Sequence, residues 1–173
     1  MPWRREAGDR PQGSRRRSQR PERPAAGAWG AAGSFAGHAS PRKTFRFVEH
    51  RGEVEVELEA ATEAGIFAAA VEAFAELLPS GGGGPSACHE IVLDGDDRAL
   101  LLVDWLSELV YLAEVERFVP ERLAEFELTG GRLRATITGR RGHPSHLVKA
   151  VTLSNLEFGQ RDGIWCGRVV FDV

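Results

Sequence analysis

The residues with the clearest capacity for chemistry lie at the far end of the sequence. The segment WCGRVVFDV is typical of a β-strand, and its last two residues are Asp172 and Val173. A strand held in a sheet would hold the Asp172 carboxylate and the terminal carboxylate of Val173 one residue apart. Upstream lies Lys149, whereas every other cation beyond residue 43 is an arginine. Because lysine offers a compact point charge rather than a forked guanidinium, Lys149 is a candidate functional residue, with chance placement an equal alternative.

A third carboxylate, that of Glu53, follows a tight connection between two predicted strands. If this junction meets the end of the last strand, hard oxygen donors from Glu53, Asp172 and Val173 converge. Such donors suit Ca²⁺ or Mg²⁺, and Mn²⁺ could also bind them. Like charges this close repel one another unless a cation neutralises them, and Lys149 could offset part of the repulsion. From spacing alone, the simpler alternative is a solvated Glu53 and a frayed Asp172.

The elements that would position these residues begin with two alternating segments, which predict strands over 44–50 and 53–60. Thr62 is a suitable N-cap for a helix over 62–78. A short strand is expected over 89–95. Asp96 or Asp97 then caps a second helix over 98–115, whose wide apolar stripe indicates central burial.

The remaining sequence predicts antiparallel hairpins. The first spans 126–139 and turns at Gly130-Gly131. The second joins 148–158 to 164–173 through Gln160-Arg161-Asp162-Gly163. This order of elements predicts an α+β fold, with two helices packed on largely antiparallel sheets in one domain.

Composition limits the function classes. The hydrophobic content of 42% is enough for a core, and no apolar run reaches the ~20 residues that span a bilayer. Cys88 and Cys166 match no metal-ligand spacing, so reduced thiols in a cytoplasmic protein are expected. Residues 44–173 carry eleven arginines and one lysine against twenty-two acids, a balance of −10. This acidic body suits a protein or metal partner better than nucleic acid.

The first part of the chain differs from the rest. Residues 1–43 carry nine arginines and one lysine against three acids, a balance of +7, and they have few large apolar groups and no periodicity. We therefore expect a disordered basic tail over 1–43 and a folded domain over 44–173. The tail is interpreted as dispensable or as a start codon assigned too early. Two alternatives are a basic arm that touches RNA through Arg15, Arg16 and Arg17, and an export or transit signal.

Several familiar catalytic motifs are absent from the sequence. Gly81–Gly84 lacks the preceding strand and the following Lys-Ser/Thr of a phosphate-binding loop, so it is interpreted as a linker. Ser107 and Ser154 lack a nucleophile-elbow context, and no Cys/His pairing is evident. His143 and His146 are expected to be exposed loop residues, because a zinc site would need further ligands.

Three segments of the body resemble the archease family, small proteins that assist the RNA-splicing ligase that joins tRNA halves. Residues 47–53, FVEHRGE, are similar to the family's Glu-His-Thr-Ala-Asp opening. Residues 101–112, LLVDWLSELVYL, are similar to its Leu-Asp-Phe-Leu-Asn-Glu-Leu-Leu-Tyr helix. Residues 149–158, KAVTLSNLEF, precede an Asp-Val ending, as in the family. The resemblance runs from about Phe45 to Val173 and suggests a divergent bacterial-type member.

The resemblance implies a function and a site. Archease is a protein cofactor of the ligase that promotes its guanylylation and multiple turnover, and it binds a metal ion at acidic residues. Glu53 falls on the family's Asp, Lys149 on its Lys and Asp172 on its penultimate Asp, while Leu153 and Ser154 stand where the family has Tyr-His. The implied metal ligands are Glu53, Asp172 and Val173, with Ca²⁺ expected and Mg²⁺ or Mn²⁺ as alternatives.

Three function hypotheses follow. The first is a non-enzymatic activator of an RNA-splicing ligase, with the ligase as protein partner, no membrane association, and direct RNA contact left open. The second is a general chaperone or scaffold without metal dependence. The third is an independent metal-dependent hydrolase, which the lack of a recognisable base or nucleophile near the carboxylates disfavours.

Overall fold

A computed structural model describes residues 43–50, 52–78, 84–144, 146 and 148–173, with the backbone alone at 49 and 50. The chain divides into two units, Met1–Ser34 and Phe35–Val173, and the description concerns the second. The interpretations of the basic leader, including Arg15, Arg16 and Arg17, and of Gly81–Gly83 lie outside the described residues. The elements are β1 (Thr44–His50), β2 (Glu53–Ala60), α1 (Glu63–Leu77), β3 (Ser86–Asp94), α2 (Arg98–Glu114), β4 (Phe118–Thr129), β5 (Arg132–Arg141), β6 (Ala150–Arg161) and β7 (Ile164–Asp172).

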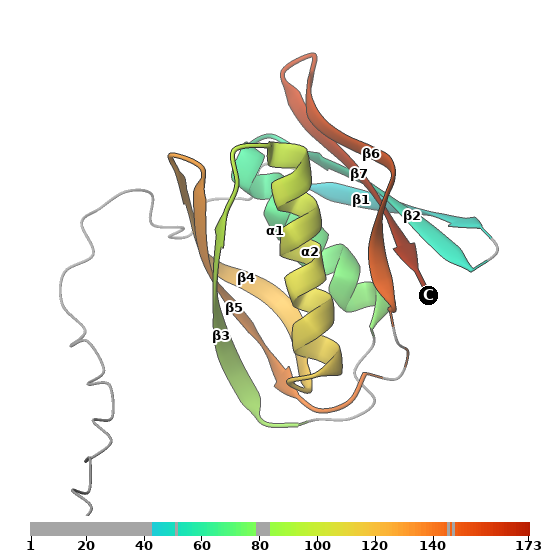
Figure 1. The fold of residues 1–173 in the computed structure, drawn as a ribbon, viewed down its shortest axis with the longest axis vertical. Helices are drawn as coiled ribbons and strands as arrows, with labels where there is room; N and C mark the ends of the chain where they lie inside the picture. Colours follow the sequence, from blue (N-terminus) through green and yellow to red (C-terminus); the bar gives the residue numbers. More distant parts are fainter. Residues whose placement is uncertain (1–42, 51, 79–83, 145, 147) are drawn as a thin grey trace, which may run out of the picture. The chain divides into compact units, whose positions relative to one another are not determined.

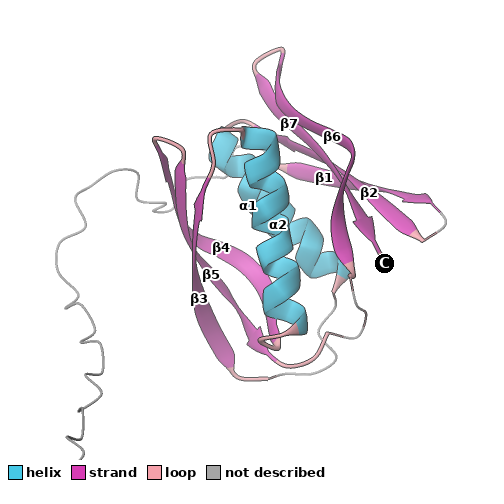
Figure 2. Ribbon diagram, in the orientation of Figure 1, coloured by secondary structure: helices cyan, strands magenta, loops and turns pink. Residues whose placement is uncertain are grey.

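The strands form two sheets with the two helices between them (Figures 1 and 2). One sheet has four strands in the order β1-β2-β7-β6, and the other has three in the order β3-β5-β4. Every strand pairing is antiparallel. The predicted α+β class, with two helices on antiparallel sheets, is therefore confirmed.

Both helices begin at capping side chains, which satisfy backbone donors that have no partner within the helix. The Thr62 hydroxyl accepts a hydrogen bond from the backbone N–H of Gly65 at 3.1 Å. The Asp97 carboxylate accepts from Ala99 at 2.8 Å and from Leu100 at 3.1 Å. The structure thus selects Asp97 rather than Asp96 as the second cap.

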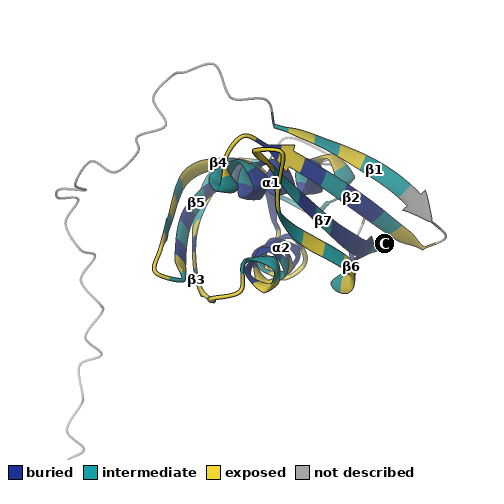
Figure 3. Ribbon diagram, turned by 90° about the horizontal axis from the view of Figure 1, so that it is seen from above, coloured by how far each residue is buried: buried dark blue, intermediate teal, exposed yellow. Residues whose placement is uncertain are grey.

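The core lies between the sheets, and Figure 3 shows the dark blue of buried residues on the helices and on β2, β5 and β7. Phe67 of α1 is its centre and is fully buried. Its ring lies 6.2 Å from that of Trp105 on α2, 5.1 Å from that of Phe126 on β4 and 6.0 Å from that of Phe158 on β6. The Trp105 indole N–H donates to the Phe67 carbonyl at 3.3 Å. This Phe67 cluster joins both helices to both sheets, and it confirms the predicted central burial of α2.

Two strands begin earlier than the sequence indicates. β3 begins at Ser86 rather than His89, and β4 begins at Phe118, eight residues before the predicted hairpin. Pro120 hides the start of β4, because proline donates no backbone hydrogen bond and weakens a strand pattern. β4 is an edge strand, where proline is tolerated, and Pro120 pairs with Gly139 of β5. A Cβ atom at Gly139 would lie 2.2 Å from the Val119 oxygen, so glycine permits this close approach.

The predicted turns of the two hairpins are present. Gly130 and Gly131 both adopt positive φ, at 58° and 83°, and connect β4 to β5. Asp162 and Gly163 adopt φ of 51° and 80° between β6 and β7. Positive φ at two central residues matches the right-handed twist of the flanking strands. Neither helix in the described part of the chain is long and apolar enough to cross a membrane.

Candidate functional site

Antiparallel pairing of β2 with β7 brings the opening hairpin to the end of the last strand. In this register Glu53 lies directly opposite Asp172. Directly opposed residues share one face of a sheet, with Cβ atoms about 5 Å apart. Val56, Leu58 and Ala60 of β2 are buried in the core, so Glu53 belongs to the alternate set that points away from the helices. Figure 1 shows the C-terminal end of β7 beside the start of β2.

Lys149 lies immediately before β6 and reaches the same place. Its backbone N–H donates to the Asp172 carbonyl at 2.8 Å. Its ammonium donates to the Val173 main-chain oxygen at 2.8 Å and lies 3.5 Å from Asp172 Oδ1. The Val173 N–H in turn donates to the Gly52 carbonyl at 3.2 Å. The structure therefore places Glu53, Lys149, Asp172 and Val173 at one end of the four-stranded sheet, which we name the sheet-end site.

The sheet-end site is open to solvent. The side chain of Lys149 is 64% exposed and that of Asp172 is 45% exposed, and Glu53 is also exposed. A ligand or partner surface can therefore reach these oxygens directly. Because water screens the Lys149–Asp172 pair, its contribution to stability is small.

The donor chemistry of the sheet-end site fits a hard cation. Its oxygens come from two carboxylate side chains and the Val173 main chain, and the Lys149 ammonium already supplies a positive charge to two of them. Carboxylate and carbonyl oxygens are the donors that Ca²⁺ and Mg²⁺ prefer. Among the described residues, no three Asp, Glu, His or Cys side chains gather as a metal-binding cluster. Any ion here would therefore rely on Glu53, Asp172 and main-chain oxygen.

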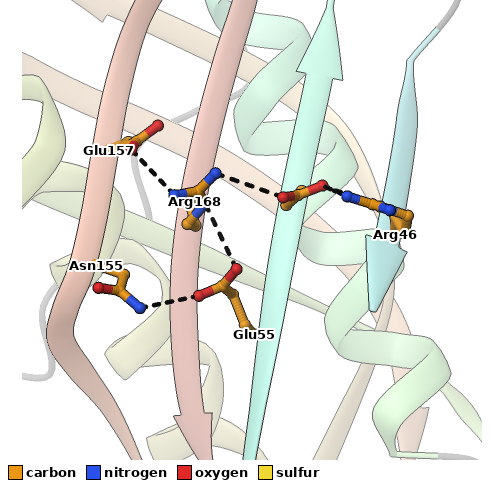
Figure 4. A network of polar contacts seen from close by, with 6 residues as sticks. Arg46, Glu55, Asn155, Glu157 and Arg168 are labelled. Atoms are coloured by element: carbon orange, nitrogen blue, oxygen red, sulfur yellow. Dashed lines mark hydrogen bonds and ion pairs between the residues drawn. The ribbon is translucent and has the colours of Figure 1, made fainter. Parts of the chain in front are cut away.

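A second polar cluster lies further along the outer face of the same sheet and surrounds Arg168 (Figure 4). The Arg168 guanidinium lies 3.5 Å from Glu55 and 3.4 Å from Glu57 on β2, and 3.0 Å from Glu157 on β6. The Arg46 guanidinium of β1 pairs with the far oxygen of Glu57. One cation thus links β7 to both of its neighbouring strands. We name this set the Arg168 cluster.

The charges of the Arg168 cluster change how two of its groups titrate. The hydrogen bond from Arg46 lowers the pKa of the Glu57 carboxyl, an effect that burial opposes and that the nearby Arg168 charge reinforces. The same hydrogen bond raises the pKa of the Arg46 guanidinium. Glu57 therefore stays ionised at pH values below its ordinary range, and its own pairing with Arg46 persists into mild acid.

Acid should weaken the fold partly through Glu57. Because its folded-state pKa is lowered, Glu57 contributes stability above its ordinary value of 4.5, and this contribution is lost as pH falls through the folded-state pKa. We expect Glu57→Gln to lower the unfolding free energy slightly at neutral pH and to flatten its decline in acid. Chemical denaturation of both proteins between pH 7 and pH 3 checks this. Parallel curves across that range would contradict it.

Sequence reasoning missed the Arg168 cluster. The alternation of EVEVELEA indicates that Glu55 and Glu57 face outward, which is correct, but it also suggests exposure. Glu55 is only 9% exposed in the structure. The available signal was the lone Arg168 inside the apolar strand IWCGRVVFDV, because a cation in such a strand usually has a carboxylate partner on a neighbouring strand.

The other candidate residues lie elsewhere. His143 and His146 are exposed, as predicted. His89, half-buried, lies with its ring 5.8 Å from that of Phe118. Cys88 is exposed, Cys166 is half-buried, and both are free thiols. None of these residues belongs to the sheet-end site.

The fold and the geometry thus define a class of protein. It is a two-sheet α+β domain with an oxygen-rich site at the end of one sheet. Residues 45–173 match the family model described as the Archease protein family (MTH1598/TM1083). The chain therefore belongs to the archease family.

Named relatives agree with this assignment. Protein archease of Methanosarcina acetivorans is 31% identical over 144 residues, which cover 78% of this chain and 99% of the relative. Protein archease of Pyrobaculum neutrophilum is 29% identical over 139 residues, which cover 75% and 95%.

Two solved structures share the fold. A crystal structure from Thermotoga maritima, described as an archease and possible chaperone, has a TM-score of 0.56 at 19% identity and covers 79% of this chain and 100% of that chain. The solution structure of Methanobacterium thermoautotrophicum protein 1598 has a TM-score of 0.56 at 23% identity, with coverage of 75% and 98%.

Proposed function

We propose that this protein is a non-enzymatic activator of an RNA-splicing ligase that promotes guanylylation of the ligase and its multiple turnover. Membership of the archease family supports the class of protein. The observation that carries the proposal is the convergence of Glu53, Lys149 and Asp172, which come from three separate stretches of chain. The resemblance to the family places its acidic residues and its lysine at these positions.

Glu53, Asp172 and Val173 would hold a divalent ion, Ca²⁺ being favoured because its coordination tolerates the longer Glu53 side chain. When bound, the ion supplies positive charge that can attract phosphate oxygens. The protein's own groups then have two tasks. The carboxylates hold that charge at the sheet-end site, and the Lys149 ammonium adds a second cation beside it.

The open position of the sheet-end site favours action on a partner. A catalytic pocket normally excludes water around its reacting groups, whereas Lys149, Asp172 and Glu53 all face solvent. The oxygens could therefore enter a cleft of the ligase, where they would be desolvated on docking. The sheet-end site would then be a surface that inserts into the ligase, rather than a complete active site of its own.

A ligase assay tests the proposal. The matching ligase is incubated with GTP and RNA ends, with and without the full-length protein, in Mn²⁺, Mg²⁺ or Ca²⁺. We expect the protein to raise the yield of guanylylated ligase and to convert one round of joining into several. A chelator added in excess should remove the stimulation. Equal turnover with and without the protein in every cation would overturn the proposal.

A general chaperone is the second candidate, because the structural relative from Thermotoga maritima is described as a possible chaperone. A chaperone of this kind would suppress aggregation of unrelated proteins without a divalent ion. Suppressed aggregation of a heated model substrate in the presence of chelator, without ligase stimulation, would favour this second function.

A further inference from the structure

The pairing of β6 with β7 changes register partway along the strands. At the start of β6, Ala150 pairs with Asp172 and Thr152 pairs with Val170. The next pair is Glu157 with Arg168, so β6 has advanced five residues while β7 has advanced two. Three extra residues of β6 are therefore accommodated in an irregular segment, residues 153–156, which we name the β6 bulge.

The β6 bulge decides whether Lys149 reaches the sheet-end site. If the pairing of Glu157 with Arg168 continued without a shift, Asp172 would lie opposite Leu153. Lys149 would then lie three positions beyond Val173, roughly 10 Å further along the strand direction at about 3.3 Å per residue. The shift instead places the Lys149 backbone N–H 2.8 Å from the Asp172 carbonyl.

The side chain of Asn155, in the β6 bulge, forms a hydrogen bond to β2, which is not the neighbouring strand. Asn155 adopts φ of 53°, a left-handed conformation that asparagine tolerates better than most residues. Its amide donates to Glu55 Oε2 at 3.1 Å, and Glu55 lies on β2, on the far side of β7 (Figure 4). Val170 of β7, which pairs with Glu55, is 3% exposed although it alternates with the core residues Val169 and Phe171.

The Arg168 cluster adds ion pairs to the hydrogen bond between Asn155 and Glu55. The guanidinium that lies 3.5 Å from Glu55 also lies 3.0 Å from Glu157, the first paired residue after the β6 bulge. Glu55 therefore receives Asn155 from within the bulge and Arg168 from the strand beneath it. Asn155 thus contacts Glu55 directly, and Glu157, which follows the bulge, is linked to the same carboxylate through Arg168.

We propose that Asn155 is a positioning residue, which holds the three-residue register shift of β6 through Glu55 and so sets Lys149 against Asp172 and Val173. The functional meaning of this positioning rests on the proposed role of Lys149 in ligase activation. The structural statement does not, because the location of Lys149 can be measured without a ligase.

The lysine content of the chain provides the measurement. Lys43 and Lys149 are the two lysines. Lys43 is paired with Glu72 of α1, far from the β6 bulge in the sequence, so it serves as an internal reference. Limited acetylation of the full chain, followed by peptide mass spectrometry, gives the ratio of Lys149 to Lys43 reactivity. A general loss of stability raises both rates, whereas loss of positioning raises the ratio.

Asn155→Gly is the main variant, because glycine adopts φ of 53° without strain and only the amide is lost. We expect the Lys149-to-Lys43 ratio to rise roughly two- to fivefold, the range for loss of an exposed ion pair. Asn155→Asp places a second carboxylate beside that of Glu55, and the two repel each other. This variant should raise the Lys149-to-Lys43 ratio at least as much. Ser154→Ala changes an exposed neighbour in the same bulge and should leave the ratio at the parent value.

A double variant that moves the carboxylate from position 55 to position 155 tests whether the position of Lys149 can be restored. In the double variant Glu55→Gln with Asn155→Asp, the donor and acceptor exchange places, so the hydrogen bond across β7 can form again, while the ion pair of Arg168 with Glu55 is lost. The ratio should return toward the parent value, which a nonspecific packing defect would not allow. If Asn155→Gly does not fold, the comparison of Asn155→Asp with the double variant decides the question.

Unchanged ratios in Asn155→Gly and Asn155→Asp, both folded, would overturn the positioning role. The ligase assay separates this outcome from failure of the proposed function. A raised ratio with full ligase stimulation would keep the positioning role and refute the role of Lys149 in activation. An unchanged ratio, together with loss of stimulation in Lys149→Gln, would do the reverse.

Discussion

Replacing Asp172 with asparagine is expected to abolish stimulation of the ligase. Asp172 is the residue on which the sheet-end site converges, because its carboxylate lies 3.5 Å from the Lys149 ammonium and opposite Glu53. Asparagine keeps the size and the main-chain pairing but removes the negative charge. Since even indirect partners of a metal cost 10–100-fold in affinity when lost, we expect affinity for a divalent ion to fall by roughly 100-fold or more. Terbium luminescence and the guanylylation assay measure the two effects.

The control for this variant is Asp162→Asn, which makes the same chemical change in the exposed β6–β7 turn. Asp162 adopts φ of 51°, and asparagine tolerates that conformation. Both variants should unfold within a few degrees of the parent, because Asp172 is half exposed and its main-chain bonds are retained. Ligase stimulation by Asp172→Asn equal to that of Asp162→Asn would refute the proposed site.

Local sequence patterns predicted the helices and strands. The family resemblance supplied the reason to expect that the start of the second strand and the end of the last strand lie together. Alternation in EVEVELEA and the cap at Thr62 depend on neighbouring residues alone, and the structure confirms both. The meeting of Glu53 with Asp172 depends on the pairing of strands separated by more than a hundred residues. No local pattern encodes such a pairing, so the carboxylates could be proposed as a site only conditionally.

The β6 bulge shows why the remainder could not be predicted. VKAVTLSNLEF indicates a regular strand, and nothing in its alternation marks a shift of three residues. The shift is visible only once Asn155, Glu55 and Arg168 are seen together across three strands. The start of β4 was missed for a related reason. Pro120 weakens a strand in isolation, and only its place at a sheet edge opposite Gly139 makes it acceptable.

Phe67→Ala should be among the most destabilising single changes in the domain. The Phe67 ring is fully buried and contacts rings from α2, β4 and β6, so it joins the four-stranded sheet to the three-stranded one. Truncating such a ring removes its burial and leaves a cavity, at about 3–5 kcal/mol. Native domains are stable by about 5–15 kcal/mol, so this is a large share of the total. Urea denaturation followed by tryptophan fluorescence measures the loss.

Phe45→Ala provides the matched comparison, because it removes the same atoms from a half-buried position on the edge strand β1, where the ring contacts Phe47 at 5.5 Å. It should cost clearly less than Phe67→Ala, since no second sheet depends on that ring. Hydrogen exchange should then show a further difference. Phe67→Ala is expected to loosen β4 and β6 together, whereas Phe45→Ala loosens β1 alone. Equal costs for the two variants would mean that contacts other than the Phe67 cluster hold the sheets to the helices.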